Sequence, residues 1–180
     1  MDSSQDGAGA NPEAGPLAMV IKAAVFAAQR HCHQRRKGVD AAPYINHPLE
    51  VADILASLGG VQELPVLLAA LLHDTVEDTA TTLEELEAEF GRDVRLLVAE
   101  VTDDKRLPKA ERKRLQVEHA PSMSQGARQI KIADKISNLR DLISNPPADW
   151  SAQRRREYVD WASQVVARYR PEFFCDKTHV

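Results

Sequence analysis

Apolar residues recur along this chain at intervals of three and four, the spacing of one face of an α-helix. From about residue 17 to 36, the positions Val20, Ala24, Ala27 and His31 follow this spacing and predict the first helix. No convincing run alternates apolar and polar residues in the way that a half-buried strand does. The pattern therefore predicts an all-α fold, with seven or so helices and no internal repeat.

Proline and glycine mark the ends of the next two predicted helices. Pro48 and Pro65 suit the first turn of a helix, where the missing backbone donor has no partner to lose. The helix after Pro48 is expected to stop near Gly59-Gly60. The helix after Pro65 is apolar nearly all round, because residues 67–72 are all Leu or Ala. A helix of this kind belongs at the centre of a domain.

The remaining helices are predicted from caps and amphipathic stripes. Thr81 or Thr82 with Glu84 or Glu85 forms a capping box, and Gly91 marks the following stop. Four more helices follow: one carrying Val94 to Val101, a charged one from Pro108 to about Glu118, one capped by Ser124 and carrying Ile132 to Ile143, and one from about Ser151 to Tyr169.

One domain accounts for most of the chain. At 180 residues the chain can bury a sizeable core, and residues 17–170 form the predicted domain. Residues 1–16, rich in Gly, Ala, Ser and Pro, are expected to be a disordered leader, and residues 171–180 a C-terminal tail. The first basic residue is Lys22, whereas a signal peptide begins with positive charge. No apolar run approaches the roughly 18 residues of a membrane span.

The charge balance narrows the class of partner. The formal net charge is -4, so no global basic field is available to hold a nucleic acid polymer. A small anionic molecule needs only a local cationic patch, so a nucleotide remains a compatible partner. Cys32 and Cys175 are too few for a disulfide framework or a thiolate metal site, and a cytoplasmic setting is the expectation.

Ionisable residues interrupt the apolar pattern at three places. The central helix ends in His73 and Asp74, His47 stands at a helix start, and Asp134 breaks the largely apolar segment 130–136. Burying an unpaired carboxylate is expensive, so these acids need a cation or strong hydrogen bonds. His47, His73, Asp74 and Asp134 form a mixed nitrogen and oxygen set that suits one Mn²⁺, Fe²⁺ or Zn²⁺ ion.

Each member of this set also has a structural explanation when it is taken alone. His47 could serve as a helix cap, and Asp134 could be a buried acid paired with Lys131 or Arg140. The joint pattern favours a metal site, because each member separately breaks an apolar environment.

Two further acids follow the central helix at helical spacing. Glu77 stands four residues after His73 and Asp78 four after Asp74, so a continuing helix places both one turn beyond the metal set. A carboxylate there can accept a proton from an attacking water or deliver one to a leaving oxygen. The alternative for Asp78 is that Asp78-Thr79 simply ends the helix in a turn.

Twelve of the 23 basic residues gather in three clusters, at 35–37, 105–114 and 154–156. Lys binds phosphate as a point charge and Arg as a fork, although the middle cluster is equally explained as a solvated face. Asn138 stands four residues after Asp134 on the same predicted helix, so it is expected to face the metal cavity.

The aromatic residues follow the apolar stripes. Trp150 and Trp161 are assigned to the core, and His31 is assigned to packing. Tyr158 lies on the apolar stripe of the last helix, so a core position and a position facing a ligand both fit it.

Three segments carry an ordered set of motifs. They are Tyr44-Ile45-Asn46-His47-Pro48, His73-Asp74-Thr75-Val76-Glu77-Asp78-Thr79 and Ile132-Ala133-Asp134-Lys135-Ile136-Ser137-Asn138-Leu139-Arg140. The chain thereby resembles the RelA/SpoT-type HD hydrolase domain, and more closely its single-domain members, the small alarmone hydrolases typified by the metazoan SpoT homologue. The resemblance runs from about Leu17 to Tyr169 and implies a single-domain HD-type helical bundle with a hydrolase-only role.

The resemblance also implies an activity and a set of site residues. Members of this family hydrolyse the 3′-pyrophosphate of (p)ppGpp to GDP or GTP and pyrophosphate, and they bind Mn²⁺. The implied metal ligands are His47, His73, Asp74 and Asp134, and the residues implicated in activating water are Glu77 and Asp78. The implied nucleotide contacts are Arg36 and Lys37 against the nucleotide, Asn138 and Tyr158 at the base and sugar, and Lys109 and Arg154 near the far phosphates.

Two other functions stay open on the sequence. A phosphatase acting on NADPH or on a 3′-phosphorylated nucleotide such as pApp fits the same residues, because each substrate joins a nucleotide to a phosphate on the ribose. A non-catalytic module that binds alarmone is the second, and the intact metal set with Glu77 argues against it. The preferred nucleotide, the native metal and the oligomeric state do not follow from any pattern in the sequence.

Overall fold

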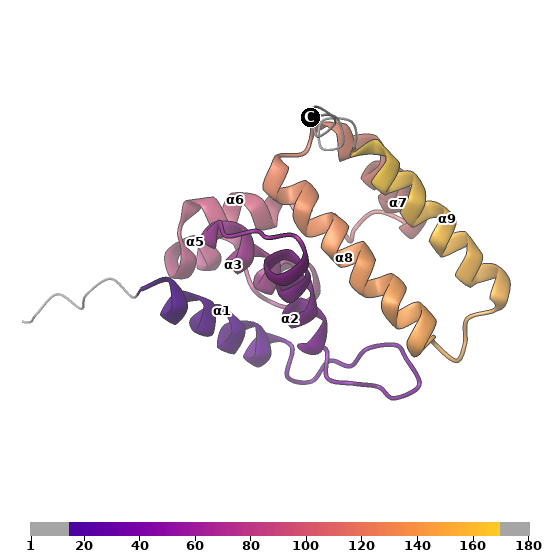
Figure 1. Cartoon of the computed structure of the whole chain (residues 1–180), viewed down its shortest axis with the longest axis horizontal. Coiled ribbons are helices and arrows are strands. Elements are labelled where there is room, and N and C mark those ends of the chain that lie inside the picture. Colours follow the sequence, from indigo (N-terminus) through magenta and orange to yellow (C-terminus); the bar gives the residue numbers. More distant parts are fainter. Residues whose placement is uncertain (1–14, 170–180) are drawn as a thin grey trace, which may run out of the picture.

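Residues 15–169 are described by the computed structural model, and most of them are helical (Figure 1). Within this range the β-structure is confined to an isolated bridge between Arg35 and Pro43, so the predicted all-α fold is confirmed. The helices are α1 (Pro16–Arg30), α2 (Asn46–Asp53), α3 (Leu64–Leu72), α4 (Thr75–Asp78), α5 (Leu83–Phe90), α6 (Arg92–Val101), α7 (Lys109–His119), α8 (Gln125–Ser144) and α9 (Ala152–Arg168). One π-helical turn, Ile54–Leu58, extends α2, and a short 3₁₀ turn, Ala120–Ser122, follows α7.

The apolar helix α3 lies at the centre, as its composition predicts. Its residues 66 and 68–72 are all buried, and α1, α2, α6 and α8 pack around it. Figure 1 shows α8 crossing the molecule, with α1, α2, α3, α5 and α6 on one side and α7 and α9 on the other. Because α8 contacts both groups, its side chains can reach a site that lies between them.

The predicted caps account for several helix boundaries. The Thr82 side chain accepts the backbone N–H of Glu85 at 3.2 Å, so Thr82 rather than Thr81 caps α5. Gly91 ends that helix with a φ of 90°, a backbone conformation that favours glycine. Ser124 and Ser151 cap α8 and α9 in the same way as Thr82. The Glu85 carboxylate pairs with Arg30 instead of completing the capping box.

The first helix is shorter than its periodicity predicts. It ends at Arg30, and the chain then forms backbone bonds of its own, from Arg36 N–H to Ala42 at 2.9 Å and from Tyr44 N–H to Gln34 at 3.1 Å. These long-range bonds compete with helical ones, so the segment to residue 36 becomes a loop. Gly38 lets this loop approach α8 closely, because a Cβ there would lie 2.5 Å from the carbonyl oxygen of Asn145.

The central helix is interrupted where the sequence predicts continuation. After Leu72 the chain makes a turn at residues 73–74, and the helix resumes as α4. The hydroxyl of Thr75 donates to the carbonyl of Leu72 at 2.7 Å, and the ring of His73 bonds the carbonyl of Ala70 at 2.8 Å. These side chains thus donate hydrogen bonds to carbonyls at the end of α3 that backbone N–H groups of a continuing helix would otherwise bond.

The predicted leader and tail fall almost wholly outside the described residues, as does Cys175. Pro16 is already the first residue of α1, one position before the predicted domain boundary. Among residues 15–169, no helix combines the length and the apolar character that crossing a membrane requires.

Shortening Leu72 to alanine should test the central role of α3. Leu72 is fully buried, so Leu72→Ala should lower the free energy of unfolding by about 2–5 kcal/mol through lost burial and a residual cavity. Urea unfolding followed by circular dichroism measures the change. Leu96→Ala on the exposed side of α6 is the matched control and should change stability by less than about 0.5 kcal/mol. Equal losses in both variants would contradict the placement of α3.

Candidate active site

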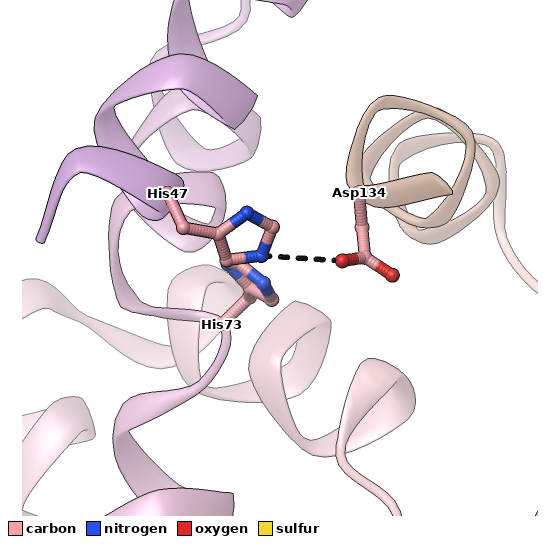
Figure 2. A group of neighbouring side chains, drawn as sticks. All are labelled: His47, His73 and Asp134. Carbon is pink, nitrogen blue, oxygen red and sulfur yellow. Dashed lines mark ion pairs between the residues drawn. The ribbon is translucent and has the colours of Figure 1, made fainter. Parts of the chain in front are cut away.

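Three separate chain segments bring two imidazoles and a carboxylate together (Figure 2). His47 comes from the first turn of α2, His73 from the end of α3 and Asp134 from the middle of α8, and all three are buried. One ligand atom of each lies within 4.8 Å of the others, and Nε2 of His47 is 3.2 Å from Oδ1 of Asp134. Nitrogen and oxygen donors at this separation could hold one divalent ion.

Asp74 completes the group from its position in the turn after α3. Its Oδ2 lies 3.1 Å from Nε2 of His73 and 3.6 Å from Nε2 of His47. The hydroxyl of Tyr44 donates to the same oxygen at 2.6 Å. Burial and the Asp74 carboxylate raise the pKa of Tyr44, which keeps the phenol protonated as a donor. Tyr44 received no role from the sequence, although it stands three residues before His47.

The charges in this group call for a cation. Burial works against ionisation of Asp74 and Asp134, but the neighbouring imidazoles and the Lys135 ammonium outweigh it and hold both pKa values below the usual range. Burial likewise opposes a charge on His73, and the two carboxylates overcome it and raise its pKa to about 9. Protons on the imidazoles or a bound divalent ion can supply the positive charge that these carboxylates attract.

One buried nitrogen supports the fit of a metal ion. The Nδ1–H of His73 bonds the Ala70 carbonyl, which leaves Nε2 with a lone pair in the neutral ring. That Nε2 is buried and makes no hydrogen bond within residues 15–169, since its contact with Asp74 lacks hydrogen-bond geometry. A metal-ligating histidine has this arrangement, with one ring N–H bonded to a backbone carbonyl and the other ring nitrogen left for the ion.

The acids of α4 line the same cavity as the imidazoles. One oxygen of Glu77 accepts the backbone N–H of Asp103 at 3.1 Å, and Arg112 lies 3.6 Å from the other oxygen. Burial raises the pKa of Glu77. Asp78 pairs with Lys105 and is also the last residue of α4, so it ends the helix while its carboxylate faces the cavity.

Asp134 has other partners than the two considered from the sequence. Its Oδ2 is 2.9 Å from the ammonium of Lys135, whereas Arg140 bonds Glu50 instead. No ion pair of Lys131 with Asp134 occurs in the described chain. Lys135 pairs with Asp134 in their place, because the two residues are adjacent in the chain and both side chains are buried.

Asn138 faces the cavity, as its helical spacing predicts. Its amide donates to Asp134 at 2.5 Å, and its oxygen accepts from the Arg36 guanidinium at 3.0 Å. A second bond of 2.7 Å joins Arg36 to Asp141. These contacts link the loop before α2 to α8 beside the acid group.

The cavity extends from this group to α7 and α9 and has a volume of about 740 Å³. An aromatic wall of Trp150, Tyr158 and Trp161 lines it, with ring centroids 5.7 and 5.4 Å apart along the series. The assignment of Trp150 to the core is therefore wrong. Trp161 packs against the core and also lines the cavity, and its indole N–H donates to the Lys113 carbonyl at 3.0 Å. His31 is buried, as expected.

Cations face this wall in excess of acids. Burial lowers the pKa of Lys109, and the charges of Arg154, Lys37 and Arg112 lower it further. Lys37, Lys109 and Arg112 line the cavity, whereas Arg154 lies with its guanidinium 4.5 Å from the centre of the Trp150 ring, outside the lining. Cations that repel one another in a cavity favour a polyanionic ligand.

The middle basic cluster divides between the two explanations considered for it. Lys105, Lys109, Arg112 and Lys113 line the cavity. Arg106 and Arg114 instead pair with acids on the solvated surface. Lys109, Arg112 and Lys113 share one face of α7 at helical spacing, and Arg114 lies off that face, whereas Lys105 and Arg106 precede the helix and follow no such spacing.

Comparisons with known proteins identify relatives along nearly the whole described range. The model of the HD domain family matches residues 23–162. The guanosine-3′,5′-bis(diphosphate) 3′-pyrophosphohydrolase MESH1 of Xenopus tropicalis is 60% identical over 153 residues, 85% of this chain and 86% of the relative. The Homo sapiens protein of the same name is 59% identical over 149 residues, 83% of each chain.

A solved structure agrees with these relatives. It belongs to a metazoan orthologue of SpoT that hydrolyses ppGpp and plays a role in starvation responses. The superposition has a TM-score of 0.83 at 46% identity and covers 90% of this chain and 89% of that one. Sequence and structure therefore agree that this chain belongs to the HD domain family and, within it, to the MESH1 group.

Proposed function

We propose that this chain hydrolyses the 3′-pyrophosphate of guanosine 3′,5′-bis(diphosphate), ppGpp, and of pppGpp, releasing GDP or GTP and pyrophosphate. The observation that carries the proposal is the meeting of two imidazoles and two carboxylates, from three chain segments, in a cavity lined with cations. The relatives whose names state this activity align along most of both chains, which supports the transfer.

The proposed metal ligands are His47, His73, Asp74 and Asp134. Two carboxylates balance the double charge of the ion, and the mixed donor set suits Mn²⁺, with Fe²⁺ and Zn²⁺ as the other candidates. The ion, when bound, supplies a Lewis acid for the phosphoryl oxygens and lowers the pKa of water.

Glu77 is the residue that we propose takes the proton of the attacking water. Burial raises the pKa of this carboxylate, which makes it a stronger base, and the Asp103 N–H holds its orientation. The water oxygen bonds to the phosphorus attached to O3′, the P–O3′ bond breaks, and O3′ takes up a proton to become the ribose hydroxyl. Asp78, held by Lys105, is the second carboxylate assigned to this proton transfer.

The nucleotide contacts follow the charges of the cavity. Arg36 and Lys37 are assigned to the nucleotide beside the metal set, and Asn138 and Tyr158 to the sugar and base. Lys109 is assigned to the 5′-phosphates. Arg154 contacts the Trp150 ring and does not line the cavity, so we assign it a charge effect on the far phosphates rather than a direct contact.

A second substrate class has support from the aromatic wall. Stacking on Trp150 and Tyr158 accepts any base, so NADPH and pApp fit the same charges and rings. Relative kcat/KM values on ppGpp, pppGpp, pApp and NADPH rank these substrates. A silent alarmone-binding module is disfavoured because Glu77 keeps its place beside the complete ligand set.

We place this activity in the cytoplasm. Cys32 is a free thiol on the exposed surface. Exposed free thiols persist in reducing compartments, because oxidising ones convert them to disulfides.

Replacing Glu77 by its amide should separate chemistry from binding. Glu77→Gln keeps the shape of the side chain but cannot take a proton, so kcat on ppGpp should fall by about 100-fold or more. Bound metal and KM should change little. Pyrophosphate release and metal content by mass spectrometry measure both. Glu87→Gln, on the surface of α5, is the control and should keep full activity. An unchanged rate in Glu77→Gln would remove this residue from the mechanism.

Replacing Asp134 by its amide should release the metal. Asp134→Asn removes a ligand charge and leaves the Lys135 ammonium without its partner, so metal per chain should fall at least about tenfold. Mass spectrometry after dialysis measures the content. Asp141→Asn, two turns along α8, should retain the metal. Full occupancy in Asp134→Asn would refute the ligand role.

Removing the Lys109 ammonium should weaken substrate binding more than turnover. Lys109→Ala should raise KM for ppGpp about tenfold, the loss of one charge-assisted phosphate contact, with a smaller change in kcat. The difference should shrink as salt rises. Arg106→Ala, whose exposed guanidinium pairs with Asp104, should leave KM unchanged. Equal KM values for both variants would exclude Lys109 from the phosphate contacts.

A further inference from the structure

We propose that Ser137 and Glu50 are positioning residues that fix the proton of His47 on Nδ1, so that its Nε2 lone pair faces the metal set. The inference deepens the proposed function and rests on His47 as a metal ligand. Neither Ser137 nor Glu50 touches the cavity described above. Their role is to act on His47 from the opposite side of its ring.

The three side chains form a continuous hydrogen-bonded relay. Nδ1 of His47 lies 2.9 Å from the hydroxyl oxygen of Ser137, and this hydroxyl lies 2.7 Å from Oε2 of Glu50. The second oxygen of Glu50 accepts from the Arg140 guanidinium at 3.3 Å. Ser137 and His47 are buried, while Glu50 and Arg140 reach the surface.

Counting protons gives the direction of the relay. A carboxylate only accepts hydrogen bonds, so the single proton of the Ser137 hydroxyl points to Glu50. The Ser137 oxygen is then an acceptor towards His47, and the proton between them belongs to Nδ1. In a neutral imidazole this leaves Nε2 without a proton.

The relay matters because the cavity side of His47 favours the opposite tautomer. Nε2 faces Oδ1 of Asp134 at 3.2 Å and Oδ2 of Asp74 at 3.6 Å. Two acceptors beside a ring nitrogen attract a proton to it, and a protonated Nε2 cannot bind a metal ion. The pull of Glu50 through Ser137 opposes this attraction.

The Nδ1 atoms of the two histidines in the site have different hydrogen-bond partners. Nδ1 of His73 bonds a backbone carbonyl, that of Ala70, which can only accept. Nδ1 of His47 meets a hydroxyl, which can donate or accept, so its direction depends on Glu50. The tautomer of His47 is therefore the one that a surface-reaching side chain can reverse.

Glu50→Gln tests the direction of the relay with little change of shape. The glutamine amide can donate to Ser137, which frees the serine proton for Nδ1 of His47 and moves the ring proton to Nε2. The dissociation constant for Mn²⁺ should rise by about 10- to 100-fold. Titration of Mn²⁺ followed by the paramagnetic resonance of the free ion measures it. Asp53→Asn is the matched control on the same helix, since this carboxylate accepts from Ser57 and should leave the affinity unchanged.

Long-range proton–nitrogen NMR of His47 reads the tautomer directly in the full chain stripped of metal. We expect a protonated Nδ1 and a bare Nε2 in the unaltered chain, and a protonated Nε2 in Glu50→Gln. A protonated Nε2 in the unaltered chain, or an unchanged Mn²⁺ affinity in Glu50→Gln, would overturn this inference even if ppGpp is hydrolysed. A bare Nε2 with weakened Mn²⁺ binding in Glu50→Gln, but no turnover of ppGpp, would overturn only the proposed function.

Discussion

Negative charge buried beside two imidazoles is the constraint on which the rest of this structure depends. Asp74 and Asp134 sit in the interior, where an uncompensated carboxylate would be strongly destabilising. Lys135, His73 and the Tyr44 hydroxyl each offset part of that cost. The surrounding helices stabilise the fold by packing, but the two buried carboxylates require polar and charged side chains to face the interior beside them.

The cations that line the other part of the cavity are not balanced in the way that the buried carboxylates are. Lys37, Lys109 and Arg112 line the cavity close enough to repel one another, so the cavity favours a ligand that brings several negative charges. The rings of Trp150, just before α9, and of Tyr158 and Trp161 on α9 add a surface for a flat base. The cavity thus joins a group of acids and imidazoles at one end to cations and aromatic rings at the other.

Local patterns predicted much of this architecture. Prolines, glycines and capping hydroxyls mark helix ends within a turn, and the apolar run of α3 placed the centre. The positions of Tyr44 and Ser137 were within the motifs, yet their roles could not be inferred. The bonds from His47 to Ser137 and from Ser137 to Glu50 span 90 and 87 residues, and no periodicity within one helix reveals such pairs. Trp150 was assigned inward for a related reason, since apolar character alone does not distinguish a core from a cavity wall.

Helix α8 is one continuous helix that contributes side chains to both halves of the site. Asp134 belongs to the acid group, and Asn138 and Asp141, one and two turns further along, bond Arg36. The close approach of Gly38 to Asn145 packs the C-terminal end of α8 against the loop that carries Arg36. Sliding α8 along its axis would therefore disturb ion binding and ligand affinity at once. The cavity-lining residues of α7 belong to a helix that packs mainly on α9, so substitutions there can change ligand affinity without shifting α8.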